Sequence, residues 1–368
     1  VRDPLVCSGQ TAAEGWTNAQ RSLREMGGVR IVPGGSRTAA DGDDGLATFW
    51  KDNKLNPDQL ILAGAFSSTD QFPAAEIGRP NAAGAPNVWR VYLQPNSPAM
   101  ARLGYRTDGT QSEAARLALV QAAFTPDGAA RVLRILDRKG SHHYAVIGSV
   151  GMGTLAGDGQ QTPYIDLTGA VILQQESRTT ACGLQGLNVG ATVNVVNFVR
   201  YSLKRLDDPQ TYPQFAAVYA DEVPGTHEES RAELVREELD VTGTAITDTT
   251  ELVAEYAVDL KFSVSQLTTT GTLVEIAEGD DGIDAAAGNP RAGGGNARPD
   301  RIRSVHARLA VRSREADRDA NIDLEAANLP VGGLYRVALG ANATGPYARV
   351  RTLQADIALR NHMRAVRW

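Results

Sequence analysis

The sequence predicts an α+β fold that is dominated by antiparallel β-sheet. The main observation is an alternation of apolar and polar residues with a period of two, which recurs over residues 193–203, 252–264, 304–312 and 353–359. A strand turns successive side chains to opposite faces, whereas a helix would scatter the same residues around its axis. Helix signals are fewer and shorter. We therefore expect a single β-rich domain over residues 1–368.

The first elements expected along the chain are a helix, a short strand and a second helix. TNAQRSLREMGG, residues 17–28, is rich in helix formers and ends in two glycines, as helices often do. NPDQLILAGAF, residues 56–66, predicts a short strand after Pro57. SEAARLALVQAAF, residues 112–124, predicts a helix with Ser112 as its N-cap.

Strands are expected from the middle of the chain onward. Two apolar runs flank the turn at 137–140, which predicts a hairpin. ESRAELVREEL, residues 229–239, is compatible with a helix or a strand. The stretch 278–300 is rich in Gly, Ala, Pro and Asp and is expected to be a long surface loop. In 193–203 one face of the expected strand is apolar, with Asn197 as its one exception; the apolar residues are Val193, Val195, Val199, Tyr201 and Leu203.

Three later segments are expected in the core sheet. In 252–264 the even-numbered residues are expected on the core face and the odd-numbered ones mostly in water. The expected core face is Leu252, Ala254, Tyr256, Val258, Leu260, Phe262 and Val264. RIRSVHARLAVRSREADRD, residues 301–319, carries six arginines. We expect Arg308 and Arg312 on the wet face of a strand, opposite solvent or cross-strand carboxylates. In 353–359 the odd-numbered residues form the expected core face.

Composition excludes some classes of protein. The net charge is −6, which argues against a dedicated nucleic-acid binder. No apolar run approaches the roughly 18 residues that a membrane-spanning helix needs. The two cysteines, Cys7 and Cys182, are either free thiols or one disulfide, and composition favours neither.

The sequence offers no recognisable catalytic, cofactor or metal motif. Gly151, Gly153 and Ala156 match a dinucleotide fingerprint, but no helix follows, so a Gly-rich loop between strands is expected. His227 lacks a second histidine, because Arg231 stands where a zinc-protease motif requires one. Other possible ligands do not fit either: the adjacent His142 and His143 point to opposite faces of a strand, and the acidic turns at 41–44 and 280–284 do not match an EF-hand loop.

A family resemblance joins several of these segments. NPDQLILAGAFSSTDQF, NVVNFVRYSL, AELVREEL, TELVAEYAVDLKFSVS, RIRSVHARLAVRSREADRD and YARVRTLQADIALRN follow one another in an order that resembles the globular part of a type IV pilus minor pilin. The chain is similar to PilW-type minor pilins and, more distantly, to J-type pseudopilins of type II secretion. The resemblance covers about residues 57–361 and is most specific in the last third.

The resemblance implies a structural protein without enzymatic activity or cofactor. It implies a pilin-type head whose N-terminal hydrophobic helix would lie upstream of Val1 and would be its link to the membrane. Its partners would be other minor pilins, the major pilin and a PilY-type tip adhesin. It would be located in the inner membrane, facing the periplasm, before assembly and at the tip of the extracellular pilus afterwards. In such an exported head, a Cys7–Cys182 disulfide is favoured. The alternatives are a secretion pseudopilin and a secreted β-sandwich binding protein or enzyme.

Overall fold

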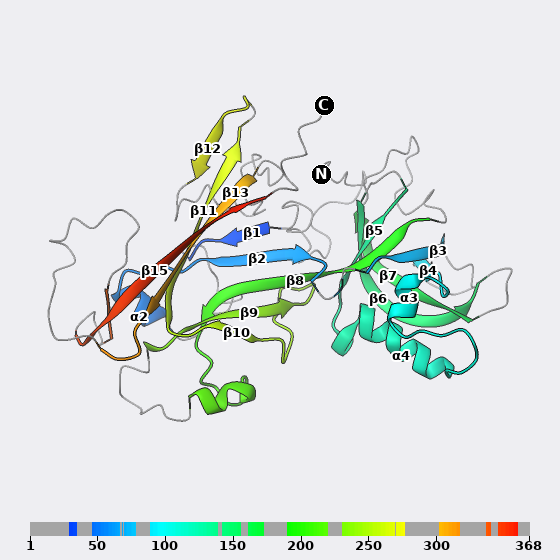
Figure 1. Cartoon of the computed structure of the whole chain (residues 1–368), viewed down its shortest axis with the longest axis horizontal. Helices are drawn as coiled ribbons and strands as arrows, with labels where there is room; N and C mark the ends of the chain where they lie inside the picture. The colour runs from blue at the N-terminus through cyan, green and yellow to red at the C-terminus, as the bar shows by residue number, and fades with distance from the viewer. Residues whose placement is uncertain are drawn as a thin grey trace.

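The fold is mostly antiparallel β-sheet with few helices, which confirms the β-rich class expected from the sequence (Figure 1). The computed structural model describes residues 29–34, 46–66, 68, 70–78, 89–138, 142–155, 161–172, 190–219, 230–268, 270–276, 302–316, 336–339 and 345–359. The expected helix at 17–28 and the expected loop at 278–300 lie outside the described residues. The extent of one domain over residues 1–368 stays a prediction.

Five strands form a first sheet. Its order is β1–β2–β8–β9–β10, and every neighbouring pair is antiparallel. The segment 229–239, which was compatible with a helix or a strand, contains the strand β9. The strands span Val29–Val32, Gln59–Gly64, Thr192–Lys204, Glu233–Leu239 and Glu251–Ala254 in chain order.

Five further strands form a second sheet in the order β12–β11–β13–β15–β14. All of its described pairings are antiparallel, and β13 runs beside β15 from Ser304 opposite Ala358 to Arg312 opposite Val350. The strands span Ala257–Leu267 (β11), Leu273–Ile276 (β12), Ile302–Arg312 (β13), Arg336–Ala338 (β14) and Tyr347–Ala358 (β15).

The two sheets share a hydrophobic core. Ile31 of β1, Leu203 of β8 and Leu234 of β9 pack with Phe262 of β11 and other buried residues of the second sheet. Helix α2, Ala47–Asp52, adds Trp50 to this core. Burying such side chains is the dominant favourable term in folding.

Asp58 joins the two sheets at one corner. Its backbone N–H donates to the carbonyl of Leu260, and its buried carboxylate accepts from the N–H groups of Gly34 and Phe262. Lys261 pairs with the same carboxylate at 3.0 Å. A carboxylate buried in this way is tolerated because an opposite charge and hydrogen bonds replace its water.

Six strands close into a small antiparallel barrel beside the first sheet. The ring runs β8–β3–β4–β7–β6–β5 and closes because the first half of β8 pairs with both β3 and β5. The new strands span Phe72–Gly78 (β3), Trp89–Leu93 (β4), Val132–Leu136 (β5), His142–Thr154 (β6) and Gln161–Ile172 (β7). The β5–β6 pairing, with Leu136 opposite His142, confirms the hairpin predicted at 137–140.

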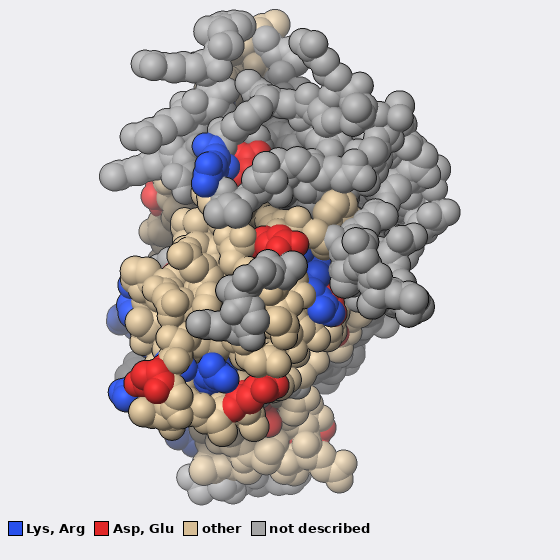
Figure 2. Space-filling model, turned by 90° about the vertical axis from the view of Figure 1, so that its right-hand side faces the viewer, with Lys and Arg blue, Asp and Glu red and all other residues tan. Residues whose placement is uncertain are grey.

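Side chains fill the barrel, and two helices cover it. Phe124 of α4 (Glu113–Phe124) packs on Phe72 at 5.0 Å between ring centroids, and Met100 of α3 (Pro98–Arg102) is fully buried. Ser112 accepts a hydrogen bond from the N–H of Ala115, which confirms it as the N-cap of α4. In Figure 2, the described charges on the barrel end are scattered, with acidic groups next to basic ones. The other helices in the described ranges are short 3-10 turns, η3 (Pro126–Gly128) and η4 (Pro213–Val218).

Strand β8 is buried on both faces, not on one as the alternation indicates. It passes from the barrel into the first sheet, so both parts cover it (Figure 1). Val193 lies in the barrel core and Leu203 between the two sheets, as expected. The alternate residues are buried as well, among them Asn194, Phe198 and Lys204.

The segment 252–264 is not one strand. It turns at Tyr256, where the backbone φ is 54°, and thereby leaves the first sheet (β10) for the second (β11). Leu260, Phe262 and Val264 are buried as expected. On the alternate face of β11, Asp259, Ser263 and Ser265 are also buried rather than solvated, each at most 9% exposed, and Lys261 is half-buried.

The faces of β13 and β15 also differ from the expectation. Arg312 is buried rather than wet, and Arg308 pairs with the buried Asp259 at 3.2 Å, which is the cross-strand carboxylate we expected. Residues 353–358 join the sheet at the end of β15, but they are not core: Leu353 is 62% exposed and Ile357 48% exposed. The first sheet therefore does not cover the second as far as this end of β15. Leu359, just after the strand, is half-buried against the core that the two sheets share.

Gly151 and Gly153 lie within strand β6, not in a loop. A Cβ atom on Gly151 would come within 2.4 Å of the Tyr164 ring, and one on Gly153 within 3.1 Å. These glycines therefore make room for an aromatic side chain on the neighbouring strand β7. Arg90 stacks on the same ring at 3.5 Å and pairs with Asp166.

Candidate functional site

A buried stack of tyrosines and arginines fixes the corner between β10 and β11. Arg231 lies 4.5 Å from the ring centroid of Tyr219 and 4.6 Å from that of Tyr256, and it pairs with the fully buried Glu233. Glu233 also accepts from the N–H of Tyr256 at 2.8 Å and from the Tyr219 hydroxyl at 3.2 Å. Burial raises the pKa of Glu233 above its ordinary value, although Arg231 opposes the change. Arg312 stacks on the other side of this corner, 4.9 Å from the Tyr256 centroid.

A second buried cluster lies on the first sheet. Glu237 is 1% exposed and accepts hydrogen bonds from Arg200 and Lys204, each at 2.9 Å. Burial raises the pKa of Glu237, but the positive charges of Lys204 and Arg200 outweigh it, so that the pKa lies below its ordinary value. Both clusters are closed by protein groups, and we therefore assign them to holding the fold.

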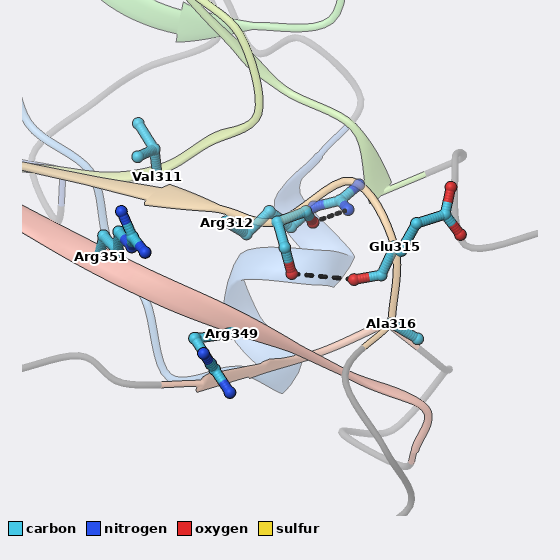
Figure 3. A pocket seen from close by; sticks show the side chains of 7 residues that line it. Val311, Arg312, Glu315, Ala316, Arg349 and Arg351 are labelled. Atoms are coloured by element: carbon cyan, nitrogen blue, oxygen red, sulfur yellow. Dashed lines mark hydrogen bonds between the residues drawn. The ribbon is translucent and has the colours of Figure 1, made fainter.

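The candidate binding site is an arginine-lined pocket at the end of β13 and the start of β15. Its volume is about 500 Å³, within the range of small-molecule sites. Figure 3 shows Arg349 and Arg351 on β15, with Arg312 and Glu315 on the end of β13 and the turn that follows. The lining residues are Val311, Arg312, Ser313, Glu315, Ala316, Arg349 and Arg351.

Short hydrogen bonds shape this pocket. The N–H of Ser313 donates to the carbonyl of Arg349, and the Ser313 hydroxyl donates to the carbonyl of Glu315, both at 2.8 Å. The Arg312 guanidinium donates to the carbonyls of Ser313 and Arg314 and is therefore part of the wall. The turn after β13 is thus tied to β15.

The charge of the pocket favours an anion. Three arginines face one glutamate among the lining residues. Arg349 and Arg351 are exposed and, being two residues apart on a strand, lie on one face of the sheet. Arg336 of β14 stands directly opposite Arg349, so a further cation borders the site. Arginine binds carboxylate and phosphate groups with a planar pair of donors, which makes such groups the fitting ligands.

Ser265, His306 and Asp356 lie in the order of a hydrolytic triad across β11, β13 and β15. The Ser265 hydroxyl is 3.1 Å from Nε2 of His306, and Nδ1 of His306 contacts Asp356. Ser265, however, is in a strand that is paired on both sides, so the nearby N–H groups serve the sheet and do not converge on an oxyanion site. We interpret the three residues as a cross-strand polar ladder.

Several residues singled out in the sequence lie outside the described part. These are Cys7, Cys182, His227 and the acidic turns at 41–44 and 280–284, so the disulfide stays a prediction. Arg231 is a buried ion-pair partner, and His142 and His143 begin β6. Among the described residues, no group of three or more His, Cys, Asp or Glu side chains is placed to hold a metal.

Comparison with known proteins finds no matching family model, no matching curated protein and no matching solved structure. Within the described ranges, no helix has the length and apolar character needed to span a membrane. The fold and the pocket must therefore be interpreted from their own geometry.

Sequence reasoning did not identify the arginine pocket. The signal was present as the alternating pair Arg349 and Arg351, but alternation alone does not show that these residues meet the turn at 313–316. This contact depends on the register in which β13 pairs with β15, and the paired residues are far apart in the sequence.

Proposed function

We propose that the chain is the globular head of a type IV pilus minor pilin, a structural subunit that takes part in starting pilus assembly and in the tip complex. The supporting observation is that each segment carrying the resemblance contains a strand of the two sheets: β2, β8, β9, β10 with β11, β13 and β15. A rigid β scaffold that displays binding surfaces suits such a role.

The barrel fits this proposal as an elaboration of the head. Strands β3 to β7 lie between β2 and β8, the strands of the first two segments of the resemblance, so the barrel enters the head at one place. The chain leaves the first sheet at Gly64 and re-enters it at Asn197, and these two residues are paired. An insertion at neighbouring positions leaves the surrounding sheet unchanged, and it adds surface for contacts.

We assign no reaction to the chain. The buried clusters around Glu233 and Glu237 are closed by arginine, lysine and tyrosine partners, and the exposed site is a pocket for an anion. The partners in this proposal are other minor pilins, the major pilin and a PilY-type tip adhesin. The place is the periplasmic side of the inner membrane before assembly and the pilus tip afterwards, and nucleic acid has no role.

The test is a deletion of the gene in the native host, with an epitope-tagged copy for complementation. We expect loss of surface pili in the deletion strain and a minor tagged band in sheared, purified pili. Normal pili with loss of protein secretion would instead identify a pseudopilin of type II secretion. Normal pili and normal secretion, with the tagged chain free in the medium, would refute the proposal in favour of a secreted β-sandwich protein.

A further inference from the structure

Among the described strands, β15 has a long outer edge that is paired only at its start. On its inner side, β13 pairs with residues 350–358 without a break in register. On its outer side, β14 pairs only with residues 347–349, and no other described strand pairs with that edge. Residues 353–358 are all exposed. A strand edge of this kind is a template for the addition of another strand.

The hydrogen-bonding direction of β15 follows from its two ends. The carbonyl of Arg349 accepts from Ser313, and the N–H of Leu359 donates to Arg303, so odd-numbered residues turn their backbone groups toward β13. In an antiparallel ladder the next residues turn theirs the other way. Gln354 and Asp356, with Val350 and Ala358, therefore present N–H and C=O groups to the outer edge.

One face of this edge has a basic end and an apolar end. Arg349 and Arg351 lie at the pocket, and Leu353, Ala355 and Ile357 follow on the same face. Leu353 and Ile357 are 62% and 48% exposed. A strand that pairs here gains the most if it carries carboxylates beside the arginines and apolar side chains beside the leucine and isoleucine.

A second copy of this chain fits the edge poorly. Paired residues of antiparallel strands share a face, so each arginine needs a carboxylate on its own face. The acidic residue within 350–358 is Asp356, and its side chain alternates onto the opposite face. Two β15 edges would therefore bring arginines together with apolar residues rather than with carboxylates.

We propose that β15 takes up an extended segment of a partner protein as an added antiparallel strand. Its apolar residues cover Leu353 and Ile357, and its carboxylates enter the arginine-lined pocket. The identity of the partner as another subunit of the assembly rests on the proposed function, whereas the mode of binding rests on the edge and the pocket. Main-chain hydrogen bonds supply affinity in this mode, and the side chains supply specificity.

The probe is the acetylated, amidated peptide Val-Thr-Val-Thr-Val-Thr-Glu with a fluorescent label. Paired antiparallel to 351–357, it sets its valines opposite Ile357, Ala355 and Leu353 and its glutamate opposite Arg351, and it stops short of Arg349, which already pairs with Arg336 of β14. Its control has lysine in place of the glutamate. We expect fluorescence anisotropy to show binding of the acidic peptide to the full chain, and at least about tenfold weaker binding of the control.

Two pairs of variants separate the edge from the pocket. Gln354→Pro removes an outward N–H without touching the β13 ladder, and we expect at least about tenfold loss of binding, whereas Gln354→Ala stays within about twofold. Arg351→Glu is expected to reverse the preference between the acidic and the lysine peptide, and Arg351→Lys to keep it. Melting temperatures close to that of the parent chain are expected for all four, because both positions are exposed.

Three results would overturn the proposal. They are equal binding of the two peptides, no binding of either at about 1 mM protein, and a dimer of the parent chain that Gln354→Pro abolishes, which would assign the edge to a second copy. Peptide binding in a chain that is absent from pili would refute the pilin role alone. A chain that enters pili but does not bind the peptide would refute strand addition alone.

Discussion

Glu237 offers the sharpest test of the buried ion pairs. Changing Glu237 to Gln keeps the shape of the side chain but leaves the cations of Arg200 and Lys204 without their carboxylate. Their side chains are only 6% and 8% exposed, so water cannot replace it. Removing one partner of a buried ion pair typically costs about 3–5 kcal/mol, and we expect a loss of unfolding free energy in this range.

The matched control is Glu251→Gln on the same sheet. Glu251 pairs with Arg236 at 3.0 Å, but its side chain is 63% exposed. Exposed pairs contribute at most about 1 kcal/mol, so this variant should unfold almost as the parent chain does. Urea unfolding followed by circular dichroism and tryptophan fluorescence measures both free energies. Equal, small losses for the two variants would refute the assignment of Glu237 to a dry cluster.

The stability of the parent chain and that of Glu237→Gln should depend differently on pH. Glu237 has a pKa below its ordinary value of 4.5 in the folded chain. Its ionised form therefore stabilises the fold above about pH 4.5, and this stabilisation is lost as the pH falls through the folded pKa. Between pH 4.5 and more acidic conditions, the parent chain should lose more stability than Glu237→Gln. A parallel loss in both proteins would contradict the proposed cause of the shift.

Three further outcomes test the corrected faces and glycines. Leu260→Asp should lower the unfolding free energy by several kcal/mol, because it buries a charge. Leu353→Asp on the same sheet face should change it by less than about 0.5 kcal/mol, and similar losses for the two variants would show that the core is assigned to the wrong residues. Gly151→Ala should lower the unfolding free energy by about 1–3 kcal/mol, and adding Tyr164→Ser should restore part of this loss. No recovery in the double variant would show that the Tyr164 ring is not the cause. Ser265 should stay unlabelled by a fluorophosphonate probe in mass spectrometry, and labelling would establish an activated nucleophile.

Local patterns predicted the elements that depend on nearby residues. The helix at Glu113–Phe124 followed from Ser112 and a run of helix formers, and the β5–β6 hairpin followed from a turn between two apolar runs. In both cases the interactions that fix the structure lie within a few residues of each other, so the sequence alone contains them.

The failures arose where distant residues decide. Period two divides a strand into faces, but it does not say what covers each face. Leu353 has the pattern of a core residue and is exposed, while Asn194 is buried because β8 belongs to two β regions at once. The break at Tyr256 was hidden because Arg231 and Glu233, remote in the sequence, hold its backbone in the turn. The arginine pocket was missed for the same reason.

Strand β8 has a mechanical consequence. It is one stretch of 13 residues that belongs to the barrel in its first half and to the first sheet in its second. Its ladders run perpendicular to the strand, so tension between the barrel and the sheet loads many hydrogen bonds in shear at the same time. They cannot be opened one after another from an end. Under load, the barrel and the sheet should therefore yield together at high force rather than peel apart.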